Sequence, residues 1–190
     1  MTTTIVVAKN GIACIAADTL ARYGSTTESA EWIVNSDKLV MVGDSVLAPC
    51  GPASAQLLLA SYFADADHRA SFDGVDDIYE TVRQMQAVLK DDYFLNPKED
   101  EADPFDSMQM ECLVANPSGI YGIYPLRSVQ AYTRFYAFGS GAAYALGAMH
   151  MAWEGEEDAE AIARAGLAAA AAFDDSTAAP FTSHAIQLRA

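Results

Sequence analysis

The chain opens with two short apolar segments separated by a turn signal. Residues 3–8 and 12–17 are almost entirely apolar or β-branched, a composition that favours β-strands. The Asn10-Gly11 pair between them favours a tight hairpin turn. The chain is therefore predicted to begin with a β-hairpin whose second strand ends at Asp18.

The rest of the apolar pattern predicts alternating groups of strands and helices. Strands are expected over residues 39–42, 46–48, 108–115, 120–124, 132–138 and 183–188, and helices over 53–66, 75–93, 141–153 and 158–173. The order ββββ, αα, βββ, αα, β indicates an α+β protein. We expect a four-layer αββα sandwich, with two antiparallel sheets between two helical layers.

Two polar stretches interrupt this pattern. Residues 19–37 are rich in turn formers and predict a loop with strand fragments, and residues 96–107 contain two prolines and five acidic side chains, which predicts a solvated loop. The stretch 165–172 is alanine apart from Gly166 and Leu167, so its helix must pack closely against a neighbour. No linker composition divides residues 1–190, and one domain is expected.

Charge and cysteine content narrow the classes of function. The 26 acidic and 11 basic side chains give a net charge of -15, which argues against binding to nucleic acid or to an anionic membrane. No apolar run is long enough for a membrane span or signal peptide. The three cysteines lack metal-ligand spacing, so we expect free thiols, a cytoplasmic protein, and neither metal nor cofactor.

The candidate chemistry begins at the second residue. Removal of Met1 would leave Thr2 with a hydroxyl and an α-amine on adjacent atoms, so that nucleophile and general base arrive together. Of the four lysines, only Lys38 begins a strand that is expected to lie beside the first hairpin. Asp18 ends the second strand of that hairpin, so Lys38 and Asp18 are the candidates for a charged pair beside Thr2. Gly51, at a strand-to-helix break, is the candidate to supply a backbone N–H to an oxyanion.

These residues resemble a known family. The matching segments are Thr2-Thr3-Thr4-Ile5-Val6, Asn10-Gly11, Ile15-Ala16-Ala17-Asp18, Lys38, Cys50-Gly51 and Phe138-Gly139-Ser140-Gly141. They are similar to proteasome β-type subunits and HslV, with the closest likeness to the beta-proteobacterial proteasome homologue. The resemblance implies the N-terminal nucleophile hydrolase fold and a threonine endopeptidase in homo-oligomeric stacked rings that acts on unfolded proteins or peptides.

The resemblance also implies a role for individual residues. Thr2 matches the nucleophile, Asp18 and Lys38 the adjacent charged pair, Gly51 the oxyanion amide, and Ser140 with Asp175 a group that positions the terminal amine. The first specificity pocket maps to small or apolar positions, which implies cleavage after apolar residues: Ala21, Ser36, Val40, Pro49 and Ala53.

Two departures from the family leave other functions open. The loop 19–37 is longer than the family usually shows, and Ala178 stands where many members have a serine, three residues after the acid. A catalytically idle ring subunit is therefore an alternative, and a non-proteolytic N-terminal nucleophile amidase that acts on a small amide is a third hypothesis. Gly139-Ser140-Gly141 is interpreted as a helix start, because no lysine follows it as in a phosphate-binding loop. Any dependence on ATP would come from a partner such as an unfoldase.

Overall fold

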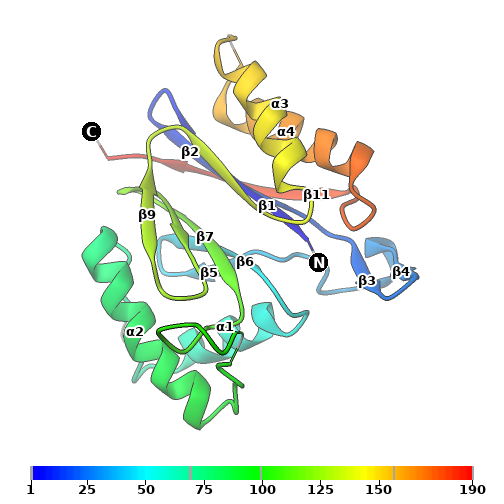
Figure 1. Cartoon of the computed structure of the whole chain (residues 1–190). Coiled ribbons are helices and arrows are strands. Elements are labelled where there is room, and N and C mark those ends of the chain that lie inside the picture. The colour runs from blue at the N-terminus through cyan, green and yellow to red at the C-terminus, as the bar shows by residue number, and fades with distance from the viewer. Residues whose placement is uncertain (1, 69, 99, 156, 190) are drawn as a thin grey trace.

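The computed structural model describes residues 2–68, 70–98, 100–155 and 157–189. Within these residues the elements alternate in groups of strands and helices (Figure 1). The strands are β1 (Thr3–Lys9), β2 (Ile12–Asp18), β3 (Ala21–Tyr23), β4 (Thr26–Glu28), β5 (Val40–Val42), β6 (Ser45–Cys50), β7 (Glu111–Asn116), β8 (Gly119–Ile123), β9 (Val129–Tyr132), β10 (Phe135–Gly139) and β11 (Phe181–Gln187). The helices are α1 (Ala55–Ala64), α2 (Val75–Asp91), α3 (Ala142–Trp153) and α4 (Ala159–Phe173), with a 3-10 turn η1 (Ala30–Trp32) after β4.

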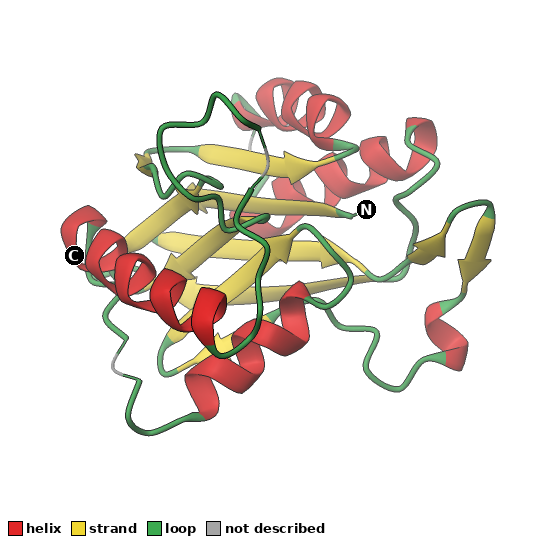
Figure 2. Ribbon diagram, turned by 60° about the horizontal axis from the view of Figure 1, so that its bottom comes forward, coloured by secondary structure: helices red, strands yellow, loops and turns green. Residues whose placement is uncertain are grey.

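The elements form four layers, as the sequence predicts. One antiparallel sheet has the order β10-β1-β2-β11, and the other has the order β5-β6-β7-β8-β9. Helices α3 and α4 cover the first sheet, and α1 and α2 cover the second (Figures 1 and 2). The αββα sandwich is thereby confirmed.

Apolar side chains fill the space between neighbouring layers. Val6 and Ile15 of the first sheet meet Val46 and Leu113 of the second in the central core. The outer cores lie under each helical pair, one around Met149 and Ile162, the other around Leu59 and Leu89. The apolar strands and the one-sided apolar faces of α2 and α4 supply much of these contacts, whereas α1 and α3 are apolar on most sides and also expose large apolar residues such as Leu57 and Met151.

The alanine-rich helix α4 packs as closely as its composition predicts. A Cβ atom on Gly166 would lie 2.8 Å from Ile5 Cδ1 and 2.9 Å from Met149 Cγ, closer than packed atoms normally approach. Small residues on α4 thus let its backbone come near both β1 and α3. This packing holds β1, and with it the start of the chain, against a rigid helical layer.

The hairpin between β1 and β2 has the predicted turn. Asn10 and Gly11 have φ values of 53° and 77°, and Lys9 pairs with Ile12 across the turn. Two consecutive positive φ values are typical of the hairpin turn favoured by Asn-Gly. This register carries Thr3 and Asp18 to the same end of the sheet.

The structure differs from the sequence prediction in two regions. Residues 19–37 contain a regular hairpin, β3 with β4, followed by η1. The strand predicted over 132–138 is instead two strands, because β9 ends at Tyr132 and β10 begins at Phe135. β9 is a half-exposed edge strand, so it lacks the apolar run that reveals buried strands. The described part of residues 96–107 contains no helix or strand, as expected.

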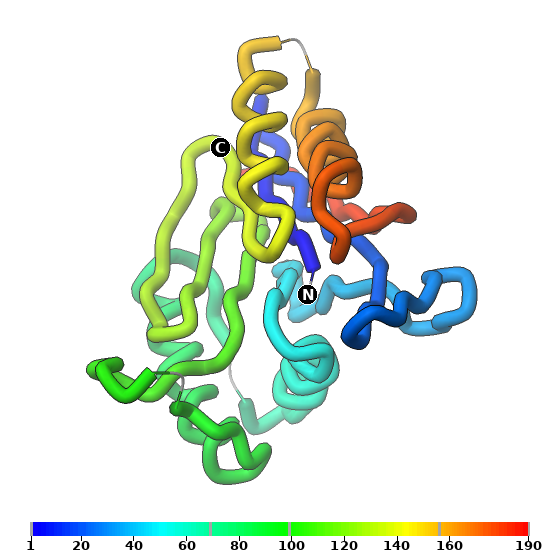
Figure 3. Tube along the Cα trace, turned by 45° about the vertical axis from the view of Figure 1, so that its right-hand side comes forward, coloured from blue at the N-terminus to red at the C-terminus, as the bar shows by residue number. Residues whose placement is uncertain are grey.

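The start of the chain lies where several of these elements converge. Figure 3 shows the N-terminal end near α1, with the β3–β4 hairpin to one side. Met1, whose removal the sequence interpretation requires, lies outside the described residues.

Candidate active site

The hydroxyl of Thr2 lies between a carboxylate and an ammonium group. Thr2 Oγ1 donates to Asp18 Oδ1 at 2.5 Å, and Lys38 Nζ donates to Thr2 Oγ1 at 2.7 Å. Lys38 Nζ also donates to Asp18 Oδ1 at 2.9 Å. Thr2 and Asp18 are buried, so water screens these interactions weakly. The structure therefore brings together the predicted nucleophile and the predicted charged pair.

The strand register explains why the start of the chain meets Asp18. β1 and β2 are antiparallel, with Thr4 opposite Ala17, so the residues preceding Thr4 lie beside the end of β2. The Thr3 N–H donates to Asp18 Oδ1 at 2.9 Å, and the Leu20 N–H donates to Oδ2 at 3.0 Å. These backbone donors fix the orientation of the carboxylate.

The Lys38 ammonium forms a third hydrogen bond, and its burial changes its pKa. Its ammonium also donates to the Leu20 carbonyl oxygen at 2.8 Å. Burial lowers the pKa of Lys38 below its ordinary 10.5, and the Asp18 carboxylate opposes that shift. The bond from Lys38 to Thr2 Oγ1 stabilises negative charge on that oxygen, which makes the hydroxyl a better nucleophile.

A second polar group lies on the other side of the chain start. The Ser140 N–H donates to the Thr2 carbonyl oxygen at 3.1 Å. The Ser140 and Thr177 hydroxyls both donate to Asp174 Oδ2, at 2.8 and 2.6 Å. Thr177 Oγ1 is in turn 2.6 Å from Thr3 Oγ1. This network holds the backbone of the first residues through hydroxyl groups rather than through a lysine.

The predicted partnership of Ser140 with Asp175 is wrong. The Asp175 carboxylate is 75% exposed, forms an ion pair with Arg22, and accepts from the Ser176 hydroxyl; these two partners lower its pKa. It is Asp174 that meets Ser140. With Asp174 as the matching acid, the residue three positions later is Thr177, which has a hydroxyl, so Ala178 is not a departure from the family pattern.

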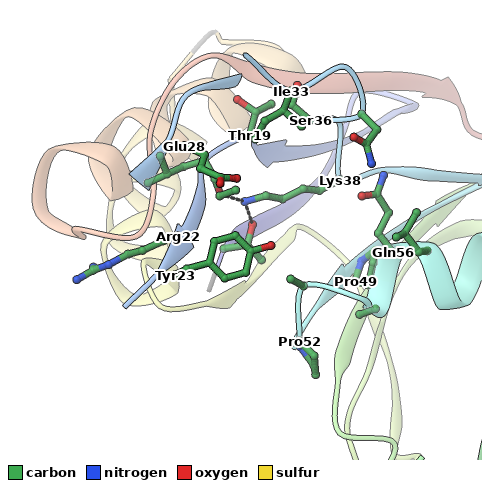
Figure 4. A pocket seen from close by; sticks show the side chains of 18 residues that line it. Thr19, Arg22, Tyr23, Glu28, Ile33, Ser36, Lys38, Pro49, Pro52 and Gln56 are labelled. Atoms are coloured by element: carbon green, nitrogen blue, oxygen red, sulfur yellow. Dashed lines mark hydrogen bonds between the residues drawn. The ribbon is translucent and has the colours of Figure 1, made fainter. Parts of the chain in front are cut away.

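Most of the predicted specificity pocket lines one cavity beside Thr2. The cavity has a volume of about 270 Å³ and Figure 4 shows it from close by. Its lining includes four of the five predicted positions, Ala21, Ser36, Pro49 and Ala53. The fifth prediction is not supported, because Val40 is 6% exposed and packs in the core between the second sheet and α1 and α2. Sequence reasoning also missed the polar lining residues Tyr23, Glu28 and Gln56.

A second, more open hollow of about 400 Å³ lies on another side of Thr2. Thr2 and Gly51 line both spaces, while Ser140 and Glu111 line only the second. Gly51 also has little space around it, since a Cβ atom there would lie 2.9 Å from Met110 Cβ. Gly51, the predicted oxyanion residue, therefore lies beside Thr2, the predicted nucleophile, and borders both spaces.

Gly139 is a residue of the site that the sequence interpretation treated only as part of a helix start. Its φ is +100°, and a Cβ atom there would overlap the Thr2 carbonyl oxygen. Only glycine combines this backbone conformation with such a close approach. The available signal was a glycine between a strand and a helix, which does not by itself say what approaches it.

The Cys50 thiol lies close to this site without competing as a nucleophile. Burial raises the pKa of Cys50 to about 12, so at neutral pH the sulfur keeps its proton, and the thiol is a poor nucleophile. Among the described residues, no group of three or more histidine, cysteine, aspartate or glutamate side chains could hold a metal ion. The described helices also include none with the length and apolarity of a membrane span.

Comparison with known proteins gives matches among solved structures. The chain is 41% identical to Thiobacillus denitrificans BPH in complex with epoxomicin, over 99% of this chain and 100% of that chain, with a TM-score of 0.92. A second structure of Thiobacillus denitrificans BPH also has 41% identity and a TM-score of 0.92, over 98% of each chain. HslV from Trypanosoma brucei has 19% identity and a TM-score of 0.63 over 97% of this chain and 99% of that one, a likeness of fold alone. No protein-family profile and no curated protein matches the chain.

The fold is that of the N-terminal nucleophile hydrolases, a class that includes proteasome-type peptidases. The chain belongs to the family of HslV and proteasome β-type subunits.

Proposed function

We propose that the chain is a threonine endopeptidase subunit whose nucleophile is Thr2 after removal of Met1. The observation that carries this proposal is the position of Thr2 Oγ1, which is hydrogen-bonded to both Asp18 and Lys38 in a buried site. The BPH structure in complex with epoxomicin adds support, because epoxomicin is a peptide epoxyketone and such compounds react with N-terminal threonine.

The reaction begins with the hydroxyl and the free α-amine of Thr2. The amine, with an ordinary pKa of about 7.7 to 8.0, accepts the hydroxyl proton, directly or through a water molecule. Oγ1 attacks the peptide carbonyl carbon, and Lys38 stabilises the developing charge on Oγ1. The amine then passes its proton to the leaving nitrogen as the C–N bond breaks, which leaves an ester on Thr2. Water, deprotonated by the same amine, hydrolyses the ester.

The surrounding residues position the reacting groups. Gly51 N–H stabilises the negative oxygen of the tetrahedral intermediate. Ser140, through its N–H to the Thr2 carbonyl oxygen, and the Asp174–Thr177 pair hold the terminal residue in place. Ala21, Pro49 and Ala53 give the cavity beside Thr2 a partly apolar lining, which supports a preference for apolar residues before the cleaved bond.

The family relationship also supports assembly. We propose stacked homo-oligomeric rings in the cytoplasm, with the active sites inside and unfolded proteins or peptides as substrates. An ATP-driven unfoldase would be a separate partner.

Two observations favour the peptidase over the idle ring subunit and the non-proteolytic amidase. The idle-subunit hypothesis rested partly on a missing hydroxyl near the terminal amine, and Thr177 supplies a hydroxyl in that region. The small-amide hypothesis is less favoured because hollows on two sides of Thr2 fit an extended chain better than a single small group.

Substitution of the nucleophile tests the proposal. Thr2→Ala should lower peptide hydrolysis by about 10⁴-fold or more, since the attacking atom is gone, whereas Thr2→Ser should keep measurable activity because it retains a hydroxyl and an amine. Both variants need their N-terminal residue determined, so that the state of Met1 is known. Hydrolysis by Thr2→Ala at the wild-type rate would overturn the proposal.

A further inference from the structure

The wall of the cavity beside Thr2 includes the β3–β4 hairpin, from the stretch that was expected to be a loop with strand fragments. β3 and β4 lie beside the chain start (Figure 1), and Ala21, Tyr23 and Glu28 all line the cavity. Ala21 pairs directly with Glu28, and directly paired residues of a two-stranded sheet project from the same face. Ala21 and Tyr23, two positions apart, also share a face. One face of this hairpin is therefore turned toward the cavity.

The two cationic side chains that line the cavity are already paired. Lys38 binds Asp18, Thr2 and the Leu20 carbonyl oxygen. Arg22 lies between Ala21 and Tyr23 in β3 and so projects from the opposite face, where it binds Asp175 and Ser176. Figure 4 shows Arg22 directed away from Lys38.

Glu28 is different, because its carboxylate has no hydrogen-bonding or ion-pair partner within the part of the chain that the structure describes. In Figure 4, Glu28 and the Tyr23 ring both extend toward the Lys38 end of the cavity. The lining thus includes one unpaired negative charge and one aromatic ring, together with the small residues Ala21 and Ala53.

We propose that Glu28 makes this cavity selective for a lysine or arginine side chain of the substrate. The methylene stem of such a side chain lies along the small, partly apolar lining, while its cationic end meets the Glu28 carboxylate. The exposed Tyr23 ring covers the stem or receives the cation on its face. This inference rests on the proposed peptidase function, and it replaces the preference for apolar residues with a preference for long basic ones, whose stems still use the apolar part of the lining.

Peptides that differ at one side chain test this selectivity. Three fluorogenic peptides would carry arginine, citrulline or leucine before the cleaved bond; citrulline has the shape of arginine without its charge. Wild-type protein should cleave the arginine peptide about tenfold more efficiently than the citrulline peptide, as expected for a hydrogen bond between charged groups. In Glu28→Gln the ratio should fall close to one. Wild-type protein should also cleave the arginine peptide more efficiently than the leucine peptide, and a faster cleavage of the leucine peptide would contradict the inference.

Glu31→Gln is the matched control, because Glu31 lies in the same segment, in η1, but does not line the cavity. It should keep the arginine-to-citrulline ratio. An equal rate for arginine and citrulline in the wild type, or a ratio that survives Glu28→Gln, would overturn the inference.

A binding measurement separates failure of this inference from failure of the proposed function. Fluorescence anisotropy with labelled peptides that end in arginine amide or citrulline amide reports on the cavity without any bond cleavage. If no peptide is hydrolysed, the peptidase proposal fails, but tighter binding of arginine that depends on Glu28 still supports the cavity assignment. Equal binding of the two peptides contradicts it, whether or not hydrolysis occurs.

Discussion

The two acidic centres that flank the start of the chain hold it in different ways. Asp18 is fully buried, binds Thr2 Oγ1, and is paired with an ammonium group. Asp174 is partly exposed and accepts from two hydroxyls, those of Ser140 and Thr177. The first arrangement controls charge at the atom proposed to react, whereas the second controls the position of the backbone. The proposed nucleophile, Thr2, is therefore contacted by one group that affects its hydroxyl and by another that holds its backbone.

Removal of the cation should have the largest effect, because it disables the charge-controlling side. Lys38→Met keeps an unbranched side chain of nearly the same length but deletes the donor to Thr2 Oγ1, and the rate of peptide hydrolysis should fall by about 10³-fold. Lys98→Met, which removes only an exposed pair with Glu101, is the control and should stay near the wild-type rate. A loss of less than tenfold in Lys38→Met would show that the two centres do not differ as described.

The Asp-Asp pair permits a sharper test of the placement side. Asp174→Asn replaces a charged acceptor of two hydroxyl donors, so kcat should fall by about 10- to 100-fold. Asp175→Asn changes an exposed ion pair with Arg22 and should alter kcat by about twofold or less. Steady-state kinetics on both variants decides the assignment. A larger loss in Asp175→Asn would restore the original sequence assignment.

Substitution of Gly51 tests whether the site also needs the predicted oxyanion N–H beside the Asp18 centre. In Gly51→Ala the new methyl group would press on Met110, so the 51–53 segment must shift, and kcat should fall by about tenfold. Gly147→Ala is the control: it lies in α3 with nothing within 4 Å of its Cβ position, and it should leave kcat unchanged while slightly raising stability. Unchanged kcat in Gly51→Ala would remove Gly51 from the site.

The smallest expected effect is a pH dependence of the unfolding free energy that comes from Lys38, the partner of Asp18. Burial lowers the pKa of Lys38 below 10.5, so just below pH 10.5 the folded chain binds fewer protons at Lys38 than the unfolded chain does. The contribution of Lys38 to the unfolding free energy should therefore increase as pH rises toward 10.5.

Urea unfolding of wild type and Lys38→Met at pH 8 and pH 10 measures this contribution. The buried cysteines act in the opposite direction above pH 9, because burial raises their pKa values to about 12. Lys38 lowers the pKa of Cys50, so its removal raises that pKa further. All three thiols therefore keep their protons in both folded proteins at pH 8 and pH 10, and their contributions cancel in the difference. Wild type should gain stability relative to Lys38→Met at the higher pH. A constant or falling difference would contradict the described environment of Lys38.

The contrast between the two centres also shows what the sequence could predict. Asp18 ends a strongly apolar strand, and Lys38 is one of only four lysines, so few choices were open on that side. On the other side, Asp174 and Asp175 are equivalent in sequence, and only the direction of each side chain after α4 distinguishes them. Local pattern identifies an acid near the site, but tertiary packing decides which of two adjacent acids faces inward.

The helices and strands also differ in how far the sequence predicts them. Strands and helices with a buried face were predicted, because burial imposes an apolar periodicity. The β3–β4 hairpin is mostly exposed, and β9 is an edge strand, so backbone pairing rather than apolar pattern holds them. Glu28 and Tyr23 could not be placed in the cavity from sequence for the same reason, and Val40 was placed there wrongly because an apolar side chain suits a core as well as a pocket.

The most direct test of the central claim is the intact mass of the purified protein before and after reaction with epoxomicin, for the wild type and for Thr2→Ala. We predict that the wild type lacks Met1 and gains one inhibitor mass per chain, whereas Thr2→Ala gains none. Retention of Met1, absence of an adduct on the wild type, or an adduct on Thr2→Ala would contradict the assignment of Thr2 as the nucleophile.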